Sequence, residues 1–337
     1  MATPVNDMHV DVAAIEKQLA QLWRTEDHDH EKALTKAALW NVVAHTWSGE
    51  QHARATEVLA QASASVPQRT IVIQAEPFGA TQMRSWIGAN CHLIAGGKQV
   101  CSEEVSIVAA GDQVDHVPPL VNALLLPDMP VAVWWVGELP RDHHEYAETL
   151  LEPADRLIFD SSQFQGRDDL ELVARIAENT TTAPADLNWA RIEEWRAAAA
   201  ALFDPASMRE RLQSIRKIRV FSGGGTSFGA LSEALLFVAW MSAQTEREIA
   251  FDYEQRGEEA GIAAVEIQFE DDSMAVLRGD RDRRVVISTS EGGHIALDCV
   301  TRTLARGEED LIVRLLKRPE ADRVYLKSLR IARRLAR

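Results

Sequence analysis

The stretch "LLLPDMPVAVWWVGELP", residues 124 to 140, places two adjacent tryptophans, Trp134 and Trp135, in a short apolar run behind a proline-bounded turn. Neighbouring side chains of a strand point to opposite faces of its sheet. Each tryptophan therefore needs apolar atoms on its own side, supplied by a covering helix or, for one of the two, by a binding partner. The stretch predicts a buried strand in a sheet that helices cover on both faces.

The sequence around this stretch alternates between strand and helix patterns. "RTIVIQA" and "DRLIFDSS" indicate strands, whereas "VPPLVNALLLP" and "HHEYAETLLEPA" indicate helices. Alternation of this kind is typical of a sheet with a parallel portion between helical layers. We therefore predict an α/β domain with a mixed sheet over residues 66–182.

The regions on either side differ from this domain. In residues 1–65, Leu39, Val42, Val43 and Thr46 follow helical spacing, which predicts an N-terminal helical region. Residues 183–337 begin with a linking helix, continue with strands that indicate an α+β domain with a largely antiparallel sheet, and end in a basic helix. The predicted fold class is α/β, with N-terminal helices, a mixed sheet flanked by helices and a second α+β domain.

The linking helix is predicted from "DLNWARIEEWRAAAAALFD". Trp189 and Trp195 fall on one apolar stripe of this helix, and Asp186 or Asn188 is suited to cap its first turn. Arg191 lies four residues before Trp195, so its guanidinium is placed to lie on that ring.

Composition limits the class of protein. The 337 residues are too many for one ordinary core, which indicates two domains, and 46% apolar residues exclude general disorder. No apolar run reaches the ~20 residues of a membrane helix, and the start of the sequence lacks a signal peptide pattern. Three cysteines, Cys91, Cys101 and Cys299, fit a reducing compartment. We expect a cytoplasmic protein without a membrane partner.

The net charge of -15 argues against a nucleic-acid partner, because binding phosphates requires concentrated positive charge. Residues 314–337 are the exception, with nine Lys or Arg against two acidic residues. Two interpretations stay open for this segment. It is either a solvated terminal helix or a docking tail for an acidic protein surface.

The glycine-rich segment "SGGGTSFG", residues 222 to 229, follows a predicted strand and precedes a helix, as in a dinucleotide site. The spacing departs from that motif, because Phe228 stands where the third glycine is required. Tight reversal of the backbone is a sufficient reason for these glycines. The segment therefore favours a structural turn over nucleotide binding.

Other chemistry-bearing residues form no diagnostic set. Asp160 and Ser161 end a strand at the edge where α/β sheets place ligands, although both residue types are also ordinary loop residues. Cys91 and Cys101 flank the turn at Gly96 and Gly97. A two-residue turn would place the two cysteines on opposite faces, so we predict free, inert thiols unless an odd-length loop shifts the register. We predict no catalytic residue, cofactor or metal.

Five segments together resemble the glucose-6-phosphate dehydrogenase assembly protein family, OpcA. In chain order, and at separations similar to those of the family, they are "ASVPQRTIVI", "NCHLIAGGKQVCSEEVSI", "LLLPDMPVAVWW", "ADRLIFDSS" and "DLNWARIEEWR". The resemblance extends over residues 15–205, and the rest matches only in general layout. It implies a non-catalytic subunit that binds glucose-6-phosphate dehydrogenase and promotes its assembly or activation.

Candidate partner-binding residues lie in or near these segments, where aromatic, arginine and polar side chains are suited to an interface centre. They are Asp128, Trp134, Trp135, Asp160, Ser161, Asn188, Trp189, Arg191 and Trp195. The alternative function is a nucleotide- or sugar-phosphate-binding enzyme or sensor that uses the "SGGGTSFG" turn. A scaffold for some other partner is a third possibility.

Overall fold

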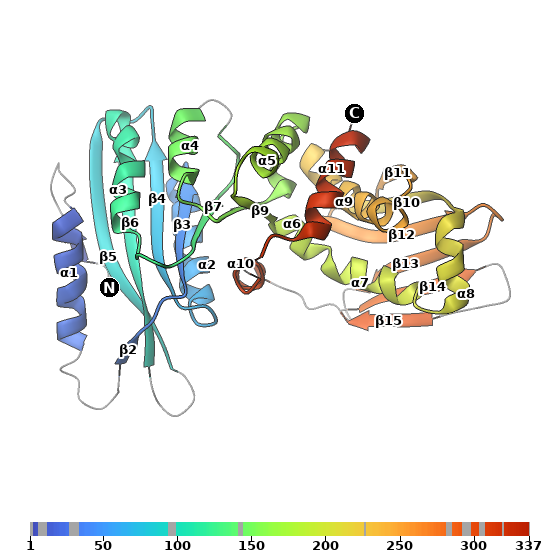
Figure 1. The fold of residues 1–337 in the computed structure, drawn as a ribbon, viewed down its shortest axis with the longest axis horizontal. Coiled ribbons are helices and arrows are strands. Elements are labelled where there is room, and N and C mark those ends of the chain that lie inside the picture. Colours follow the sequence, from blue (N-terminus) through green and yellow to red (C-terminus); the bar gives the residue numbers. More distant parts are fainter. Residues whose placement is uncertain are drawn as a thin grey trace. The chain divides into compact units, whose positions relative to one another are not determined.

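The computed structural model describes residues 3–5, 12–26, 34–93, 99–140, 144–225, 227–280, 285–291, 298–302, 307–318 and 320–336 (Figure 1). The chain forms two compact units. Unit 1 comprises residues 1–159, 181–185 and 308–320, and unit 2 comprises residues 160–180, 186–307 and 321–337. The two units thus interleave along the chain, whereas the sequence pattern suggested three consecutive regions.

Unit 1 is built on a nine-stranded sheet, sheet A, which runs in the order β1-β5-β6-β4-β3-β7-β8-β9, with β2 paired to β6. Its strands are β1 (Thr3–Val5), β2 (Leu34–Lys36), β3 (Trp40–Thr46), β4 (Gln68–Glu76), β5 (Gln82–Leu93), β6 (Gln99–Ala110), β7 (Val131–Trp135), β8 (Arg156–Phe159) and β9 (Ala183–Asp186). The ladders among β6, β4, β3, β7 and β8 are parallel, and β5 is antiparallel to β6. The path β6-β4-β3-β7-β8-β9 follows the doubly wound strand order of dinucleotide-binding folds.

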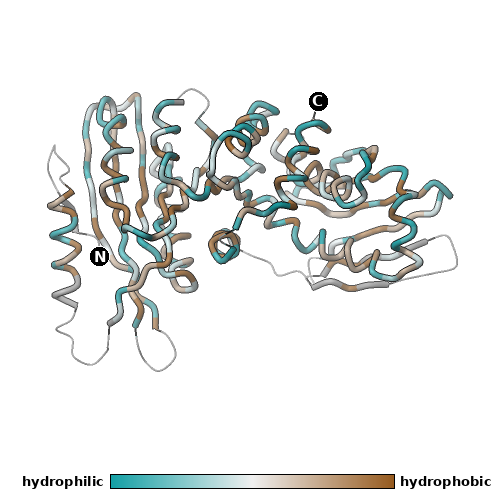
Figure 2. The backbone as a smooth tube through the Cα atoms, in the orientation of Figure 1, coloured by the Kyte–Doolittle hydropathy of each residue, from teal (hydrophilic) through white to brown (hydrophobic). Residues whose placement is uncertain are grey.

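Helices cover both faces of sheet A. Adjacent residues of β4 show this, because the Gln68 side chain donates to the Leu59 carbonyl of α2, whereas Arg69 bonds to Glu16 of α1 and to the Leu124 carbonyl of α3. The helices of unit 1 are α1 (Val12–Glu26), α2 (Gly49–Ala62), α3 (Val117–Leu124), α4 (His144–Leu151) and α10 (Glu308–Leu316), with the 3-10 helix η1 (Gly111–His116). Figure 2 shows the hydrophobic stretches of the strands that these helices cover.

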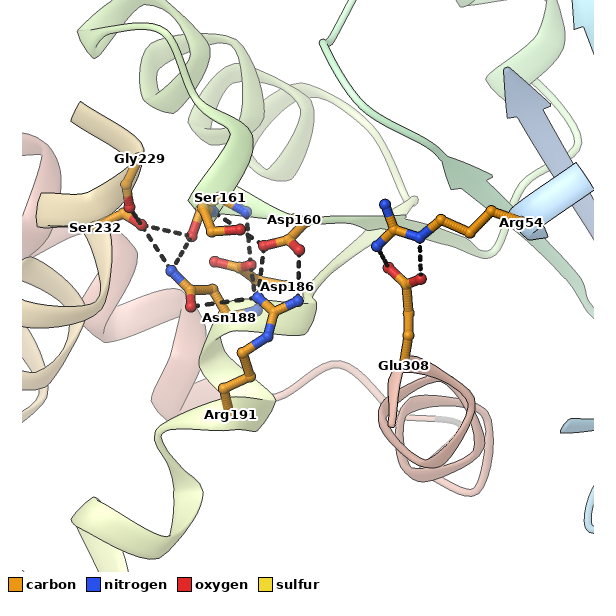
Figure 3. Close-up of polar contacts among 10 residues, drawn as sticks. Arg54, Asp160, Ser161, Asp186, Asn188, Arg191, Gly229, Ser232 and Glu308 are labelled. Carbon is orange, nitrogen blue, oxygen red and sulfur yellow. Dashed lines mark hydrogen bonds and ion pairs between the residues drawn. The ribbon is translucent and has the colours of Figure 1, made fainter. Parts of the chain in front are cut away.

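Helix α10 belongs to unit 1 although it lies more than a hundred residues after the other helices of that unit. Glu308 at its start accepts two hydrogen bonds from Arg54 of α2, at 2.7 and 2.8 Å (Figure 3). At its other end, the buried Arg156 of β8 donates to the Leu315 carbonyl and, at 3.0 Å, to the Glu320 carbonyl. Side chains from two elements of unit 1 therefore fasten both ends of this helix.

The predicted helix around Leu39–Thr46 is wrong, because residues 40–46 form β3, a central strand of sheet A. Every residue of β3 is buried. A short apolar run buried on both faces has no alternation, and its spacing is then indistinguishable from that of a buried helix.

Both tryptophans of the opening stretch are buried, as expected for a strand with helices on both faces. Trp134 and Trp135 are each 1% exposed, and all five residues of β7 are buried. The strand prediction for this stretch is thus confirmed. Neither ring reaches the surface.

The predicted register of β5 and β6 is wrong by one residue. Cys91 lies directly opposite Cys101, and the two form a disulfide. The ladder ends at the pair Leu93 and Gln99, so five residues connect the strands. With an odd number of residues in the loop, the two sulfur atoms lie on the same face of the sheet and can bond. The prediction of free thiols is therefore wrong for Cys91 and Cys101. The side chain of Cys299 lies outside the described residues.

Unit 2 is an α+β unit on a six-stranded sheet, sheet B, in the order β11-β10-β12-β13-β14-β15. Its strands are β10 (Ile215–Gly223), β11 (Ala250–Gln255), β12 (Gly261–Phe269), β13 (Met274–Asp280), β14 (Val285–Glu291) and β15 (Asp298–Arg302). All ladders are antiparallel except β10 with β11. The helices are α5 (Arg167–Asn179), α6 (Leu187–Arg191), α7 (Glu193–Leu202), α8 (Ala206–Glu210), α9 (Phe228–Thr245) and α11 (Arg323–Leu335), with η2 (Ser161–Gln163) and η3 (Arg211–Ser214).

The predicted linking helix is two helices, α6 and α7, which meet at Ile192. Asp186 caps α6 by accepting from the Asn188 backbone, so the first of the two proposed caps is confirmed. The predicted contact of Arg191 with Trp195 is wrong. Arg191 pairs with Asp160 instead, and Arg196 lies over Trp189 with its guanidinium carbon 3.4 Å from the ring centre.

The basic segment 314–337 is neither a tail nor a single helix. Its first residues belong to α10 of unit 1, and its later residues form α11 of unit 2. Tyr325, Leu329 and Ala332 of α11 are buried, and the helix contacts α9 and α5. Within the described ranges, none of the helices is both long and apolar enough to cross a bilayer.

Alanine substitution tests the burial of β7. Trp134→Ala and Trp135→Ala should each lower the free energy of unfolding by about 3–5 kcal/mol, because each leaves a cavity in a packed interior. Urea denaturation followed by circular dichroism gives the values. Trp86→Ala on β5, where the ring is half-buried, is the control and should cost less. If Trp134→Ala or Trp135→Ala lowers the free energy of unfolding by less than Trp86→Ala does, that tryptophan is not buried as described.

Candidate functional site

The carboxyl ends of β3 and β7 are the first place to look for a ligand site. These two strands are neighbours at the point where the strand order of sheet A reverses. Open α/β sheets bind ligands at this position, with phosphate groups lying against the glycine-rich turn after the first strand. In this chain the turn after β3 reads Thr46-Trp47-Ser48-Gly49, with one glycine.

Aromatic side chains of unit 1 occupy this position. The Trp47 and Trp135 indole N–H groups both donate to the Glu138 carbonyl, at 3.3 and 2.9 Å. His45 stacks on Trp135 with ring centres 4.1 Å apart, and Trp47 meets His45 edge-on at 4.5 Å. The protein's own rings thus join the end of β3 to the loop that follows β7.

Polar groups at the start of α2 are also engaged within the protein. The Trp47 backbone N–H donates to Gln51 Oε1 at 2.8 Å, and the Gln51 backbone N–H donates to Ser48 Oγ at 3.2 Å. Glu50, an exposed acid in the first turn, supplies negative charge where a dinucleotide would bring its phosphates. This site was not predicted from the sequence, because residues 40–46 were expected to form a helix and not β3.

A second polar cluster lies in unit 2, on residues 160–161, 186–191 and 229–232 (Figure 3). Arg191 donates two hydrogen bonds to Asp160, at 2.6 and 2.7 Å, in a bidentate ion pair. Burial opposes ionisation of Asp160, but the hydrogen bonds and charge of Arg191 outweigh it and lower the pKa of this carboxyl below its ordinary value. The pair therefore stays ionised near neutral pH.

Asp186, Asn188, Ser161 and Ser232 continue this cluster beside the ion pair (Figure 3). Asp186 Oδ1 accepts from the backbone N–H groups of Ser161 and Asn188, at 3.0 and 2.9 Å. The Asn188 amide donates to Ser161 Oγ and Ser232 Oγ, at 3.1 and 2.6 Å. Burial, and then the charge of Asp160, raise the pKa of Asp186 to about 7. The network ties η2 to α6 and α9 within unit 2.

The nine candidate residues have different surroundings. Asp128 is exposed in a turn with φ 62°, and the Arg191 side chain is 30% exposed. The other seven are buried, namely Trp134, Trp135, Asp160, Ser161, Asn188, Trp189 and Trp195. Four of the nine meet in the cluster of unit 2: Asp160, Ser161, Asn188 and Arg191. Their role in binding a partner stays a prediction.

The glycine-rich turn is required by packing. A Cβ on Gly223 would lie 2.0 Å from the Glu259 carbonyl oxygen, and one on Gly224 would lie 2.7 Å from the Ala260 Cα. Gly229, in the first turn of α9, passes the Ser162 carbonyl so closely that a Cβ would lie 2.0 Å from its oxygen. The turn also leads out of sheet B, not out of the doubly wound sheet. These contacts agree with the structural interpretation of the glycines.

Catalytic groups are sparse in the described part of the chain. His52 Nε2 and Ser106 Oγ are 2.5 Å apart, which brings a base to a hydroxyl group. The other ring nitrogen of His52 is buried with no hydrogen-bond partner, so no third group orients the ring, and burial lowers the pKa of His52. The described residues hold no cluster of three His, Cys, Asp or Glu side chains suited to a metal ion.

Fold and site together define a two-unit protein whose first sheet has the doubly wound strand order, with a tryptophan in the turn after the first strand of that order. A dehydrogenase from Chromobacterium violaceum has a similar fold, with a TM-score of 0.50 over 89% of this chain and 94% of that one. The two sequences are 8% identical, so the likeness concerns the fold alone.

The chain belongs to the glucose-6-phosphate dehydrogenase subunit family. Residues 59–177 match the N-terminal domain of that subunit, and residues 182–329 match its C-terminal domain. The OxPP cycle protein OpcA of Synechocystis sp. is 28% identical over 157 residues, which cover 46% of this chain and 32% of that protein. OpcA of Synechococcus elongatus is 27% identical over 175 residues, 52% of this chain and 38% of that protein. The matched segment spans about a third of these relatives, and the resemblance seen in the sequence is confirmed.

Alanine at Gly229 tests the close approach of α9 to Ser162. Alanine normally stabilises a helix by about 1 kcal/mol relative to glycine. Here the added methyl group would overlap the Ser162 carbonyl, so Gly229→Ala should lower the melting temperature and the free energy of unfolding. Gly166→Ala is the matched control, since a Cβ there meets no atom within 4 Å. A stabilising effect of Gly229→Ala would contradict the packing.

Asp186 should make stability depend on pH. Its pKa rises from an ordinary 3.8 to about 7 on folding, so the native state holds a proton that the unfolded chain has released between these values. The contribution is fully present below about pH 4 and is lost as the pH rises to about 7, by about 1.4 kcal/mol per pH unit. The difference in free energy of unfolding between the protein and Asp186→Asn should follow this slope in urea titrations. A flat difference would show that Asp186 does not bind the proton.

Proposed function

We propose that the chain is a non-catalytic accessory subunit that binds glucose-6-phosphate dehydrogenase and raises its activity. The observation that carries the proposal is the match of both halves of the chain, in order, to the two domains of the dehydrogenase subunit family. A partner enzyme then supplies the catalytic groups, and this chain supplies a binding surface. The proposal includes the cytoplasmic location expected from the sequence.

The turn after β3, which holds Trp47 and one glycine, supports a non-catalytic role. A nicotinamide dinucleotide bound in the usual way needs glycines after the first strand and free N–H groups at the start of the next helix. Here Trp47 stands in that turn and its own N–H donates to the Gln51 side chain. In the first turn of α2, the Gln51 N–H already donates to the Ser48 side chain. Binding would have to displace aromatic contacts and internal hydrogen bonds. We therefore propose that neither this position nor the glycine turn of unit 2 binds a nucleotide.

Activation would act through differential binding. A subunit raises the fraction of active enzyme only if it binds the active state more tightly than the inactive one. A tenfold shift in that equilibrium requires about 1.4 kcal/mol of differential binding. Asp128 and Arg191, the exposed or partly exposed candidates, are able to contact a partner directly. The buried candidates would act by holding the surface in shape.

Reconstitution with glucose-6-phosphate dehydrogenase from the same organism tests the proposal. The chain alone should not oxidise glucose 6-phosphate with either nicotinamide cofactor. Mixed with the enzyme, it should co-elute in size-exclusion chromatography with multi-angle light scattering and raise initial rates. Rates over a range of substrate concentrations separate a change in apparent affinity from a change in the amount of active enzyme.

Three results would count against the proposal. They are independent elution of the two proteins at micromolar concentration, unchanged rates in the mixture, or turnover by the chain alone. A nicotinamide nucleotide that raises the melting temperature of the isolated chain, with the rise removed by Gly224→Val, would favour the nucleotide-binding alternative. A nucleotide shift removed by Gly49→Val would place binding in unit 1.

A further inference from the structure

The outer face of α11 carries a continuous row of positive side chains. Arg323, Lys327, Arg330 and Arg334, here called the basic stripe, are all exposed. Their spacing of four, three and four residues places them on one side of the helix, opposite Tyr325, Leu329 and Ala332, which are buried. At 1.5 Å per residue, the stripe is about 16 Å long. It forms three turns of helix on the surface of unit 2.

The basic stripe has almost no counter-charge on the protein. Arg323, Arg330 and Arg334 form no ion pair with any residue in the described ranges. Lys327 Nζ lies 3.6 Å from Glu246 Oε1, in a pair whose side chains are 53% and 83% exposed and which therefore contributes little. Yet the chain has 51 acidic residues against 36 Lys and Arg. Unpaired cations in a row are unusual on so acidic a protein.

A neighbouring arginine on the same helix shows the contrast. Arg333 faces the protein, and its guanidinium lies 2.5 Å from Glu171 and 3.3 Å from Glu178, both on α5. The inward-facing Arg333 is thus neutralised by two acidic side chains, whereas the outward-facing basic stripe has one weak ion pair. Whether a positive side chain of α11 has an acidic partner therefore depends on the side of the helix on which it lies.

Repulsion within the basic stripe works against the helix that carries it. Like charges three or four residues apart repel each other on a helix surface, and the stripe contains three such neighbouring pairs. Arg323 is the first residue of α11, where positive charge opposes the helix dipole, whereas Arg334 in the last turn is favoured by it. A partner with carboxylates opposite these positions would relieve the repulsion.

We propose that the basic stripe is a docking surface for an acidic face of a folded protein, most simply a helix with carboxylates about one turn apart. Three of the four residues are arginines, whose planar guanidinium binds carboxylates in bidentate fashion. A nucleic acid fits less well, because the net charge of -15 repels a polyanion that extends past the stripe. The proposal deepens the proposed function, on which it rests for the identity of the partner.

Charge reversal on the full chain tests the docking surface. The stripe variant is R323E/R330E/R334E, and R323Q/R330Q/R334Q removes the charge without adding negative charge. The matched control, R84E/R175E/R278E, makes the same change in net charge at three exposed arginines outside the stripe. Melting curves confirm that each variant is folded. Affinity for glucose-6-phosphate dehydrogenase of the same organism is measured at low and high salt.

The stripe variant should bind the enzyme at least about tenfold more weakly at low salt, and the difference should shrink at high salt. The glutamine variant should lose less affinity, and the control should bind like the unaltered chain. If the unaltered chain binds the enzyme, and the stripe variant binds it as tightly as the control does, the basic stripe is not a docking surface. The proposed function would still stand.

A second arm uses poly-L-glutamate and a single-stranded RNA of similar charge, so that the surface is tested without the enzyme. If the unaltered chain does not bind the enzyme, the proposed function fails. The docking surface then stands only if poly-L-glutamate binds the unaltered chain more tightly than the stripe variant. Tighter binding of RNA than of poly-L-glutamate, lost in the same variant, would replace the protein partner by a nucleic acid.

Discussion

A central parallel strand must be covered on both of its faces, and in unit 1 this constraint acts on β7. None of its five side chains is exposed, including two adjacent indoles that point in opposite directions. One face of the sheet therefore receives α2 and the other receives α1 and α3. The short apolar strands of sheet A, and the rings that gather at the ends of β3 and β7, follow from this double burial.

The sequence predicted the elements whose pattern is local. The strands β4, β7 and β8, the helices α3, α4 and α9, and the antiparallel character of sheet B were all expected from spacing and turn residues. β3 was missed because an apolar run with no alternation fits either a strand or a helix. The register of β5 with β6 depended on loop length, which two adjacent glycines did not determine. The break at Ile192 also has no local signal such as proline or glycine.

The sites were predictable only in part, since their contacts join residues far apart in sequence. Asp160 was correctly placed at a strand end. Its ion pair with Arg191 was not predictable, because it depends on how α6 packs against the end of that strand's chain segment. Helical spacing had instead predicted a contact of Arg191 with the Trp195 ring. The position that the doubly wound order marks in unit 1 was overlooked together with β3. Once that strand is placed, Trp47 lies in the turn where a dinucleotide site of this strand order needs glycine, which supports the accessory role proposed above. A ring and its hydrogen bonds occupy the turn that glycines would otherwise leave open.

The attachment of α10 to unit 1 has a consequence for how the protein is made. A ribosome releases the first 186 residues, and with them every strand of sheet A, long before it reaches Glu308. Until then Arg54 has no carboxylate to bind, and the buried guanidinium of Arg156 has no carbonyl groups at the end of α10 to receive its hydrogen bonds. Because an unpaired buried charge is costly, this part of unit 1 stays incomplete while unit 2 is being synthesised. The nascent chain thus has a long interval in which exposed apolar surface needs protection, for example by a chaperone.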